Sequence, residues 1–93
     1  MAIQSFRCRD TEALFSGGKT RQFAQIQAVA ARKLAILNRV KRLDELRVPP
    51  ANRLEALKGD RAGQHSIRVN DQFRVCFVWT ERGPENVEIV DYH

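Results

Sequence analysis

The chain has 93 residues, a length that favours one domain, residues 1–93, with a single modest core. Its composition, 43% apolar and 29% charged, is that of an ordinary globular protein. The opening MAIQSF lacks the apolar stretch of a signal peptide and no apolar run approaches the ~18 residues of a membrane helix, so we expect a cytoplasmic protein with no membrane partner. The formal net charge of +5 favours a polyanionic partner, although it also suits solubility.

The first half of the chain predicts one short strand and two helices. Residues 3–8 (IQSFRC) have β character and suggest a short first strand. Residues 10–18 (DTEALFSGG) begin with capping residues and end on two glycines, which is typical of a short helix. Residues 21–42 place apolar side chains at three- and four-residue steps, so they predict an amphipathic helix that ends before Pro49. The cations in its last turns complement the helix dipole or serve binding.

In the second half the apolar period changes to two, which predicts strands. The segments with this alternation are 52–57, 64–70, 73–79 and 87–93. Residues rich in Gly, Asn, Asp and Pro separate these segments and mark turns. The order is therefore β-α-α-β-β-β-β. It predicts an α+β domain with two N-terminal helices packed on one face of a mainly antiparallel sheet of about four to five strands.

Two arginines are flanked by apolar neighbours in adjacent predicted strands. If residues 64–70 and 73–79 form a hairpin, Arg68 and Arg74 lie on nearby, facing positions of one open sheet face. Two guanidinium groups there can bind phosphate, because each offers a planar fork of donors. Alternatively, each pairs with a carboxylate such as Glu88 or Glu81. The spacing alone leaves both possibilities open.

Two further segments carry candidate functional groups. Lys58 and Arg61 lie in the loop KGDRAG, where cations are usually solvated but where the glycines let the backbone approach a ligand closely. Asp91, Tyr92 and His93 follow the strand pattern VEIV, so we expect this segment to be tied to the sheet rather than frayed. A histidine with an ordinary pKa of ~6.5 can transfer a proton at neutral pH, and a tyrosine can stack on a base.

The cysteines and histidines argue against other sites. Cys8 and Cys76 lie far apart without a C-x-x-C motif, so we interpret them as small buried hydrophobes rather than a disulfide. His65 and His93 are the only histidines and have no neighbour at ligand spacing. We therefore expect no metal and no cofactor.

The chain resembles the HigB toxins of the RelE superfamily. The segment LKGDRAGQHSIRVNDQFRVCFVW together with DYH is a specific combination, and IQSFRCRDTEALFSG and NRLEALKGDR extend the similarity over essentially the whole chain. The resemblance implies a RelE-like fold and a ribosome-dependent mRNA endoribonuclease that cuts the codon exposed in the ribosomal 30S A site. It also implies a HigA-type helix-turn-helix antitoxin partner, whose complex with the toxin binds operator DNA.

The resemblance assigns roles to individual residues. It implies that Lys58 contacts an RNA phosphate and that Arg74 lies at the scissile phosphate, with Arg68 as a plausible second cation. It places Asp91, Tyr92 and His93 in the catalytic group. One departure is Glu55, which stands where some family members have a histidine, so acid–base work falls on Glu55, Asp91 or His93.

Three functions compete for these residues. The first is a metal-independent endoribonuclease that uses the RNA 2′-OH as nucleophile, with cations for charge stabilisation and an acid–base group for proton transfer. The second is a non-catalytic basic module that binds RNA or an antitoxin and acts mainly in operon autoregulation. The third is a sheet edge that captures an acidic partner strand. A pure binder needs Lys58 and Arg74 but not His93.

Overall fold

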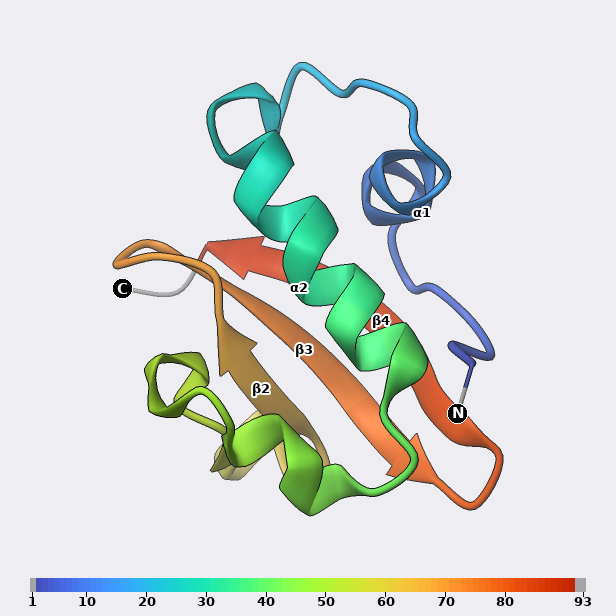
Figure 1. Ribbon diagram of the computed structural model, residues 1–93, viewed down its shortest axis with the longest axis vertical. Helices are drawn as coiled ribbons and strands as arrows, with labels where there is room; N and C mark the ends of the chain where they lie inside the picture. The colour runs from blue at the N-terminus through green and yellow to red at the C-terminus, as the bar shows by residue number, and fades with distance from the viewer. Residues whose placement is uncertain (1, 92–93) are drawn as a thin grey trace.

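The computed structural model describes residues 2–91. The elements are α1 (Arg9–Phe15), α2 (Gln27–Arg39), β1 (Glu55–Ala56), β2 (His65–Arg68), β3 (Phe73–Thr80) and β4 (Gly83–Asp91), with short 3₁₀ turns η1 (Ala24–Ile26), η2 (Leu43–Arg47), η3 (Pro50–Asn52) and η4 (Gly59–Arg61) (Figure 1). Two predicted site residues, Tyr92 and His93, lie outside the described residues. The predicted α+β class is confirmed.

The four strands form one antiparallel sheet in the order β1-β2-β3-β4. The hairpin of β2 and β3 pairs Ile67 with Val75 and Arg68 with Arg74, so the facing positions expected for the two arginines are confirmed. Helix α2 crosses β3 and β4 on one face of the sheet, and α1 packs beside it against β4 (Figure 1). The other face of the sheet, which we call the outer face, points away from α2.

The core lies between α2 and the inner face of the sheet. Ala30, Leu34 and Leu37 recur at helical spacing on α2 and are fully buried, as the apolar stripe predicts. The sheet contributes a row in register across three strands, Ile67, Val75 and Ile89. Because side chains alternate between the faces of a strand, the residues on either side of this row point to the outer face.

The second helix is shorter than the predicted 21–42. At its start, the Thr20 hydroxyl accepts a hydrogen bond from the Phe23 amide and caps a tight turn, so the α-helix begins only at Gln27. At its end, Val40 adopts extended backbone while remaining buried. The chain then enters η2, which buries Leu46 in the same core.

The predicted first strand, residues 3–8, is wrong as a strand. This segment makes one isolated parallel bridge, between Phe6 and Val87, and the Val87 amide donates to the Ser5 carbonyl. It thus runs beside β4 over a few residues only. The turn expected at 80–86 is also shorter, because β4 begins at Gly83 immediately after the exposed pair Glu81 and Arg82.

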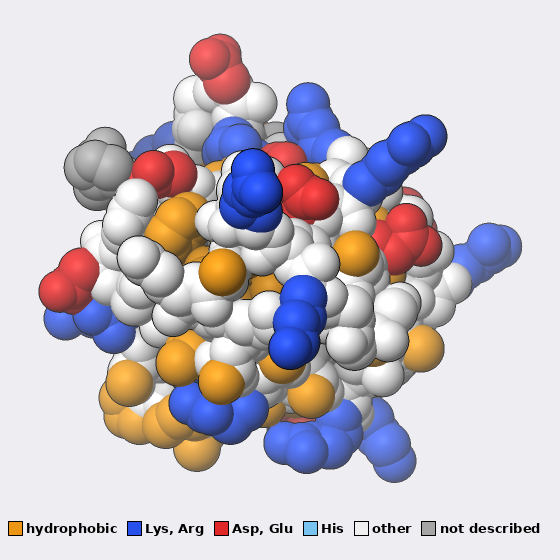
Figure 2. Space-filling view, turned by 90° about the horizontal axis from the view of Figure 1, so that it is seen from above, with side chains coloured by type: hydrophobic (Ala, Val, Ile, Leu, Met, Phe, Trp, Pro, Cys, Tyr) orange, Lys and Arg blue, Asp and Glu red, His pale blue; other side chains and the backbone are white. Residues whose placement is uncertain are grey.

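The surface carries cations on several sides. Figure 2 shows Lys and Arg side chains spread over the face seen from above, with apolar side chains between them. No single feature of that face concentrates the charge, so the placement of individual cations has to be taken from their contacts. None of the helices within residues 2–91 has the length and apolarity to cross a bilayer.

Candidate functional site

The outer face of the sheet gathers polar and charged side chains from three strands. The residues whose register and alternation place them there are Ser66, Arg68, Arg74, Cys76 and Glu88. Glu55 of β1 joins this face because it pairs with Ser66. The face is not open, contrary to the expectation from the sequence, since Ser66 and Cys76 are fully buried and Arg74 is only 9% exposed.

Arg74 is the most firmly held cation of this face. Its Nη1 lies 3.2 Å from Oε1 of Glu55, and its Nη2 donates to the Arg53 carbonyl at 2.6 Å. Arg53 has a left-handed backbone (φ 46°), a conformation that costs a non-glycine residue about 1–2 kcal/mol. The two acceptors fix the plane of the guanidinium, so its orientation is set before any ligand arrives.

Arg68 faces Arg74 across the hairpin, as predicted, but is held differently. Its guanidinium pairs with Asp71 in the β2–β3 turn, where the Asp71 carboxylate is 98% exposed. The turn itself is fixed by the Asn70 side chain, which accepts from the amides of Gln72 and Phe73. The alternative that each arginine pairs with a carboxylate is therefore confirmed, but the partners are Asp71 and Glu55 rather than Glu88 or Glu81.

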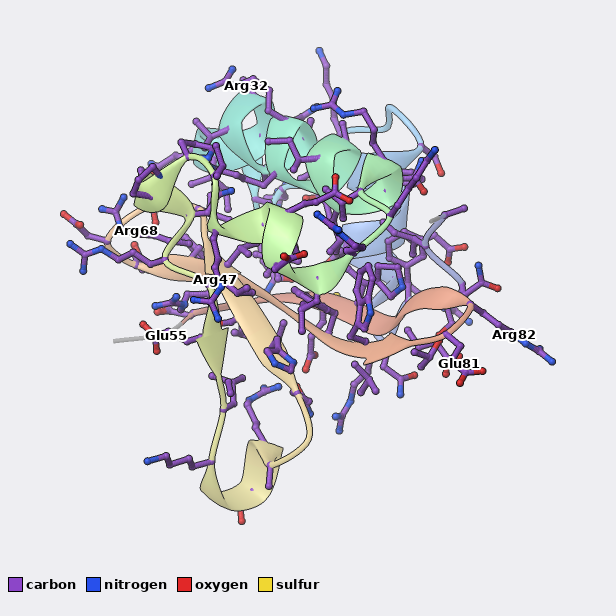
Figure 3. The ribbon with its side chains drawn as sticks, turned by 60° about the horizontal axis from the view of Figure 1, so that its bottom comes forward. Arg32, Arg47, Glu55, Arg68, Glu81 and Arg82 are labelled. Atoms are coloured by element: carbon purple, nitrogen blue, oxygen red, sulfur yellow. The ribbon has the colours of Figure 1, made fainter. Side chains whose placement is uncertain are left out.

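Those two carboxylates lie elsewhere. Glu88 binds Arg61, with 2.8 Å between Oε1 and Nη1, while Glu81 lies at the far end of the sheet from Arg68 and Glu55 (Figure 3). Arg61 also donates to Gln64 at 3.1 Å. The loop that joins β1 to β2 projects from the body (Figure 3), and Arg61 ties it to β4. Lys58, at the start of η4 in that loop, is exposed.

Cys76 lies beneath these ion pairs. Burial raises the pKa of its thiol, and the charge of Glu88 adds to the increase while Arg61 and Arg74 oppose it. The thiol is therefore neutral at physiological pH and behaves as a small buried hydrophobe, in line with the interpretation from the sequence.

Asp91 is the last described residue and ends β4, the strand that pairs with the strand of Arg74. It is opposite Phe73 at the end of β4, so its neighbour Val90 is the partner of Arg74. Its carboxylate is exposed and accepts from Nε2 of Gln72 at 3.0 Å. The expectation that this segment is tied to the sheet is confirmed for Asp91. By strand alternation Asp91 lies on the inner side of β4, and Arg74 on the outer side.

His65 does not join this group. It lies on the inner face, where its ring stacks on Phe77 with 6.3 Å between centroids. Burial lowers the pKa of His65, and its Nδ1 has no hydrogen-bond partner within residues 2–91, so the neutral ring packs as an aromatic. Across the same stretch of chain, no group of three or more His, Cys, Asp or Glu residues has the arrangement of a metal site.

One cation on α2, Lys33, was not among the site residues predicted from the sequence, yet its charge interacts with that of Arg68. Lys33 is half-buried, and its ammonium donates to the side-chain oxygen of the fully buried Asn52. The pKa of Lys33 is lowered mainly by burial, and the positive charges of Arg32 and Arg68 lower it further.

Comparisons with known proteins identify the class. The fold is shared with a chain of the YoeB–YefM complex from Staphylococcus aureus, at a TM-score of 0.58 and 18% identity over 100% of this chain and 97% of that one. The family model of the RelE-like toxins of type II toxin–antitoxin systems, HigB group, matches residues 4–93.

Two curated proteins are similar to the chain over part of its length. Toxin HigB-1 of Vibrio cholerae is 43% identical over 58 residues, and an uncharacterized protein of Haemophilus influenzae is 34% identical over 64 residues. The alignments cover 62% and 69% of this chain and span 61% and 63% of the relatives' lengths. On the family match, the chain belongs to the HigB-like toxins.

Proposed function

We propose that the chain is a toxin that cuts mRNA in the A site of the translating ribosome and so inhibits translation. The observation that carries the proposal is the arginine pair on the outer face: Arg68 and Arg74 face each other, and Glu55 lies 3.2 Å from Arg74. Such a site offers fixed donors for a phosphate and a carboxylate that can take a proton. Membership of the HigB-like family supports the same reaction.

The proposed chemistry is a metal-independent attack by the RNA 2′-OH on the adjacent phosphate. A base removes the 2′-OH proton, the 2′ oxygen bonds to phosphorus, and the bond to the 5′ oxygen breaks as an acid protonates that oxygen. Arg74 stabilises the charge that develops on the phosphate oxygens, a contribution on the order of 10²–10³ in rate for one preorganised donor. Glu55 is the described carboxylate nearest to Arg74 and serves as the base in this scheme.

The remaining predicted site residues complete the proposal. Arg68 and Lys58 bind phosphates of the strand, with Arg61 in the same loop as Lys58. Asp91, Tyr92 and His93 supply the acid and hold the base of the cut codon, as the family resemblance implies. The only support in the described residues is that Asp91 ends β4, the strand paired with β3, which carries Arg74.

We infer that the partner is a HigA-type helix-turn-helix antitoxin, and that the complex binds operator DNA through it. Support comes from the family, whose description places its members in type II toxin–antitoxin systems. Co-expression with the candidate antitoxin should restore growth. A DNA shift by the complex, absent with the toxin alone, would establish the operator role.

Mapping mRNA 5′ ends after induction tests the activity directly. We expect new 5′ ends inside translated codons, and none in the same transcript when a mutated start codon prevents translation. Arg74→Ala and His93→Ala should each abolish the new ends while antitoxin binding persists. Growth arrest without new 5′ ends would favour the non-catalytic binding module instead, and full cleavage by His93→Ala would refute the role of that histidine.

A further inference from the structure

A second group of cations comes from α2 and from the end of β2. Its members are Arg32 and Lys33 of α2 and Arg68 of β2; we call them the α2 cation cluster. Figure 3 places Arg32 at the top, on α2, and Arg68 and Glu55 at the left, all three away from Arg82 at the right. Among these three, Arg68 is also the neighbour of Arg74 across the hairpin. The cluster therefore shares Arg68 with the arginine pair.

A buried amide holds Lys33 in place. The side chain of Asn52 is fully buried, and its Nδ2 donates to the carbonyls of Leu46 at 3.1 Å and Val48 at 3.3 Å. With its nitrogen committed to two carbonyls, the amide must present its oxygen to the ammonium of Lys33. Asn52 belongs to η3, which packs against β2, so the hydrogen bond ties the ammonium of Lys33 to a turn beside the strand that carries Arg68.

The cluster has more positive than negative charge. Lys33 is bonded to a neutral amide, and neither it nor Arg32 has a carboxylate within ion-pair distance in residues 2–91. The carboxylate that pairs with Arg68, Asp71, is almost fully exposed and so easily replaced. Burial is the main cause of the lowered pKa of Lys33, and the positive charges of Arg32 and Arg68 lower it further, so a bound anion would offset the contribution of these two charges.

We propose that Arg32, Lys33 and Arg68 form a second phosphate subsite, which binds the backbone of an RNA strand one or more nucleotides away from the phosphate at Arg74. The inference rests on the proposed function for the identity of the strand. It assigns to α2 a positioning role: backbone contacts fix the register of the strand over the reactive site without selecting a base. Asn52 is the support that keeps the lysine in position.

Salt dependence of RNA binding tests the subsite without requiring cleavage. The probe is a fluorescent single-stranded RNA with 2′-deoxyribose throughout the cut codon, titrated by anisotropy between 50 and 200 mM KCl. The binding constant Kobs falls as salt rises, and each lost phosphate contact should reduce the magnitude of the slope of log Kobs against log salt by about 0.7. The loss of affinity between the two salt concentrations should then be about threefold smaller than for the wild type. We expect this change for Lys33→Met and for Arg32→Gln.

Controls separate the subsite from net charge and from folding. Arg82→Gln removes the same charge at the opposite end of the molecule and should keep the wild-type slope (Figure 3). Arg32 is exposed and anchors nothing by its side chain among the described contacts, so Arg32→Gln remains informative even if Lys33→Met disturbs Asn52. As an independent readout, the NMR-monitored pKa of Lys33 should rise when the RNA is added.

The outcomes also distinguish this inference from the proposed function. If Arg32→Gln and Lys33→Met both bind RNA with the salt dependence of the wild type, the subsite is overturned. The same conclusion holds if these variants lose binding to an acidic protein but keep the wild-type salt dependence for RNA. If the wild type cuts mRNA on ribosomes while both variants keep the wild-type slope, only the subsite fails. If both variants bind RNA with a shallower salt dependence than the wild type but the wild type never cuts mRNA, the subsite stands and the nuclease proposal fails.

Discussion

Replacing Glu55 by glutamine should separate catalysis from stability. The glutamate has Oε1 at 3.2 Å from Nη1 of Arg74, and its side chain is 50% exposed, so it lies between the buried guanidinium and the solvent from which a substrate arrives. Glutamine has the same shape and keeps an oxygen acceptor for Arg74. What it loses is the ability to take a proton at neutral pH, which is the property that a general base needs.

The structure sets different magnitudes for the two effects. A half-exposed ion pair contributes about 0–1 kcal/mol, and part of it survives as a hydrogen bond to the amide, so the free energy of unfolding should change by less than about 1 kcal/mol. Loss of a general base slows the reaction about 10²–10⁴-fold, which corresponds to about 3–5 kcal/mol of transition-state stabilisation. The variant should therefore be folded and nearly inactive.

Single-turnover cleavage of mRNA on programmed ribosomes, read by primer extension, measures the rate, and urea unfolding measures stability. Glu81→Gln is the matched control, because it makes the same chemical change at the far end of the sheet (Figure 3). If Glu55→Gln cuts at a rate within about threefold of the wild type, a change of less than ~1 kcal/mol in activation free energy, Glu55 is not the base. The acid–base role would then pass to Asp91 or His93. Glu55→His should restore part of the activity, with a rate that rises through the ordinary imidazole pKa of ~6.5.

Three further predictions concern the buried groups around the site. Arg74→Lys should lower the free energy of unfolding, measured in urea, by about 1.5–3 kcal/mol, because one ammonium cannot replace the two guanidinium nitrogens that reach Glu55 and the Arg53 carbonyl. An unchanged free energy of unfolding would contradict the role of these two hydrogen bonds. Burial lowers the pKa of His65, so below pH ~6.5 the unfolded chain takes up the proton first; the wild type should lose stability as the pH falls through this range, and His65→Phe should lose less, which unfolding at pH 7.5 and 5 can check. The buried Cys76 thiol, whose pKa is raised, should resist iodoacetamide at pH 8 until urea unfolds the protein, and peptide mapping that finds it alkylated in the native state would contradict its burial.

The hairpin could be predicted from the sequence because its information is local. Ile67 and Val69 on one side of a short polar turn, and Phe73 and Val75 on the other, have to face the same core. A slip by one residue would turn every one of these side chains to the opposite face, so the pattern leaves a single register. That register places Arg68 opposite Arg74 and is the part of the site that the sequence predicts.

The surroundings of the arginines could not be predicted in this way. Period-two alternation indicates the face of a strand on which a side chain lies, but not what covers that face. Arg74 is buried through acceptors on Arg53 and Glu55, which come from a left-handed turn and a two-residue strand with no strong pattern of their own. Lys33 and Asn52 are likewise brought together only by the packing of η3 against the sheet.

The pairing of each cation with a carboxylate determines the order in which a phosphate can engage them. Two guanidinium groups facing each other repel, and the nearby carboxylates offset this repulsion in the free protein. Arg68 can exchange its partner most easily, since Asp71 is 98% exposed and readily hydrated, whereas Glu88, 15% exposed, would be left poorly solvated if it released Arg61. Arg74 should exchange its carboxylate partner less easily than Arg68 but more easily than Arg61, because Glu55 is half-exposed.

This order has a chemical consequence in the proposed reaction. When a phosphate displaces Glu55 from Arg74, the carboxylate is released beside the 2′-OH that it has to deprotonate, so binding itself prepares the base. The exchange of partners also consumes part of the binding free energy, which favours weak affinity for free RNA. Cleavage then depends on a ribosome that holds the mRNA in place and so supplies the positioning that the toxin alone lacks.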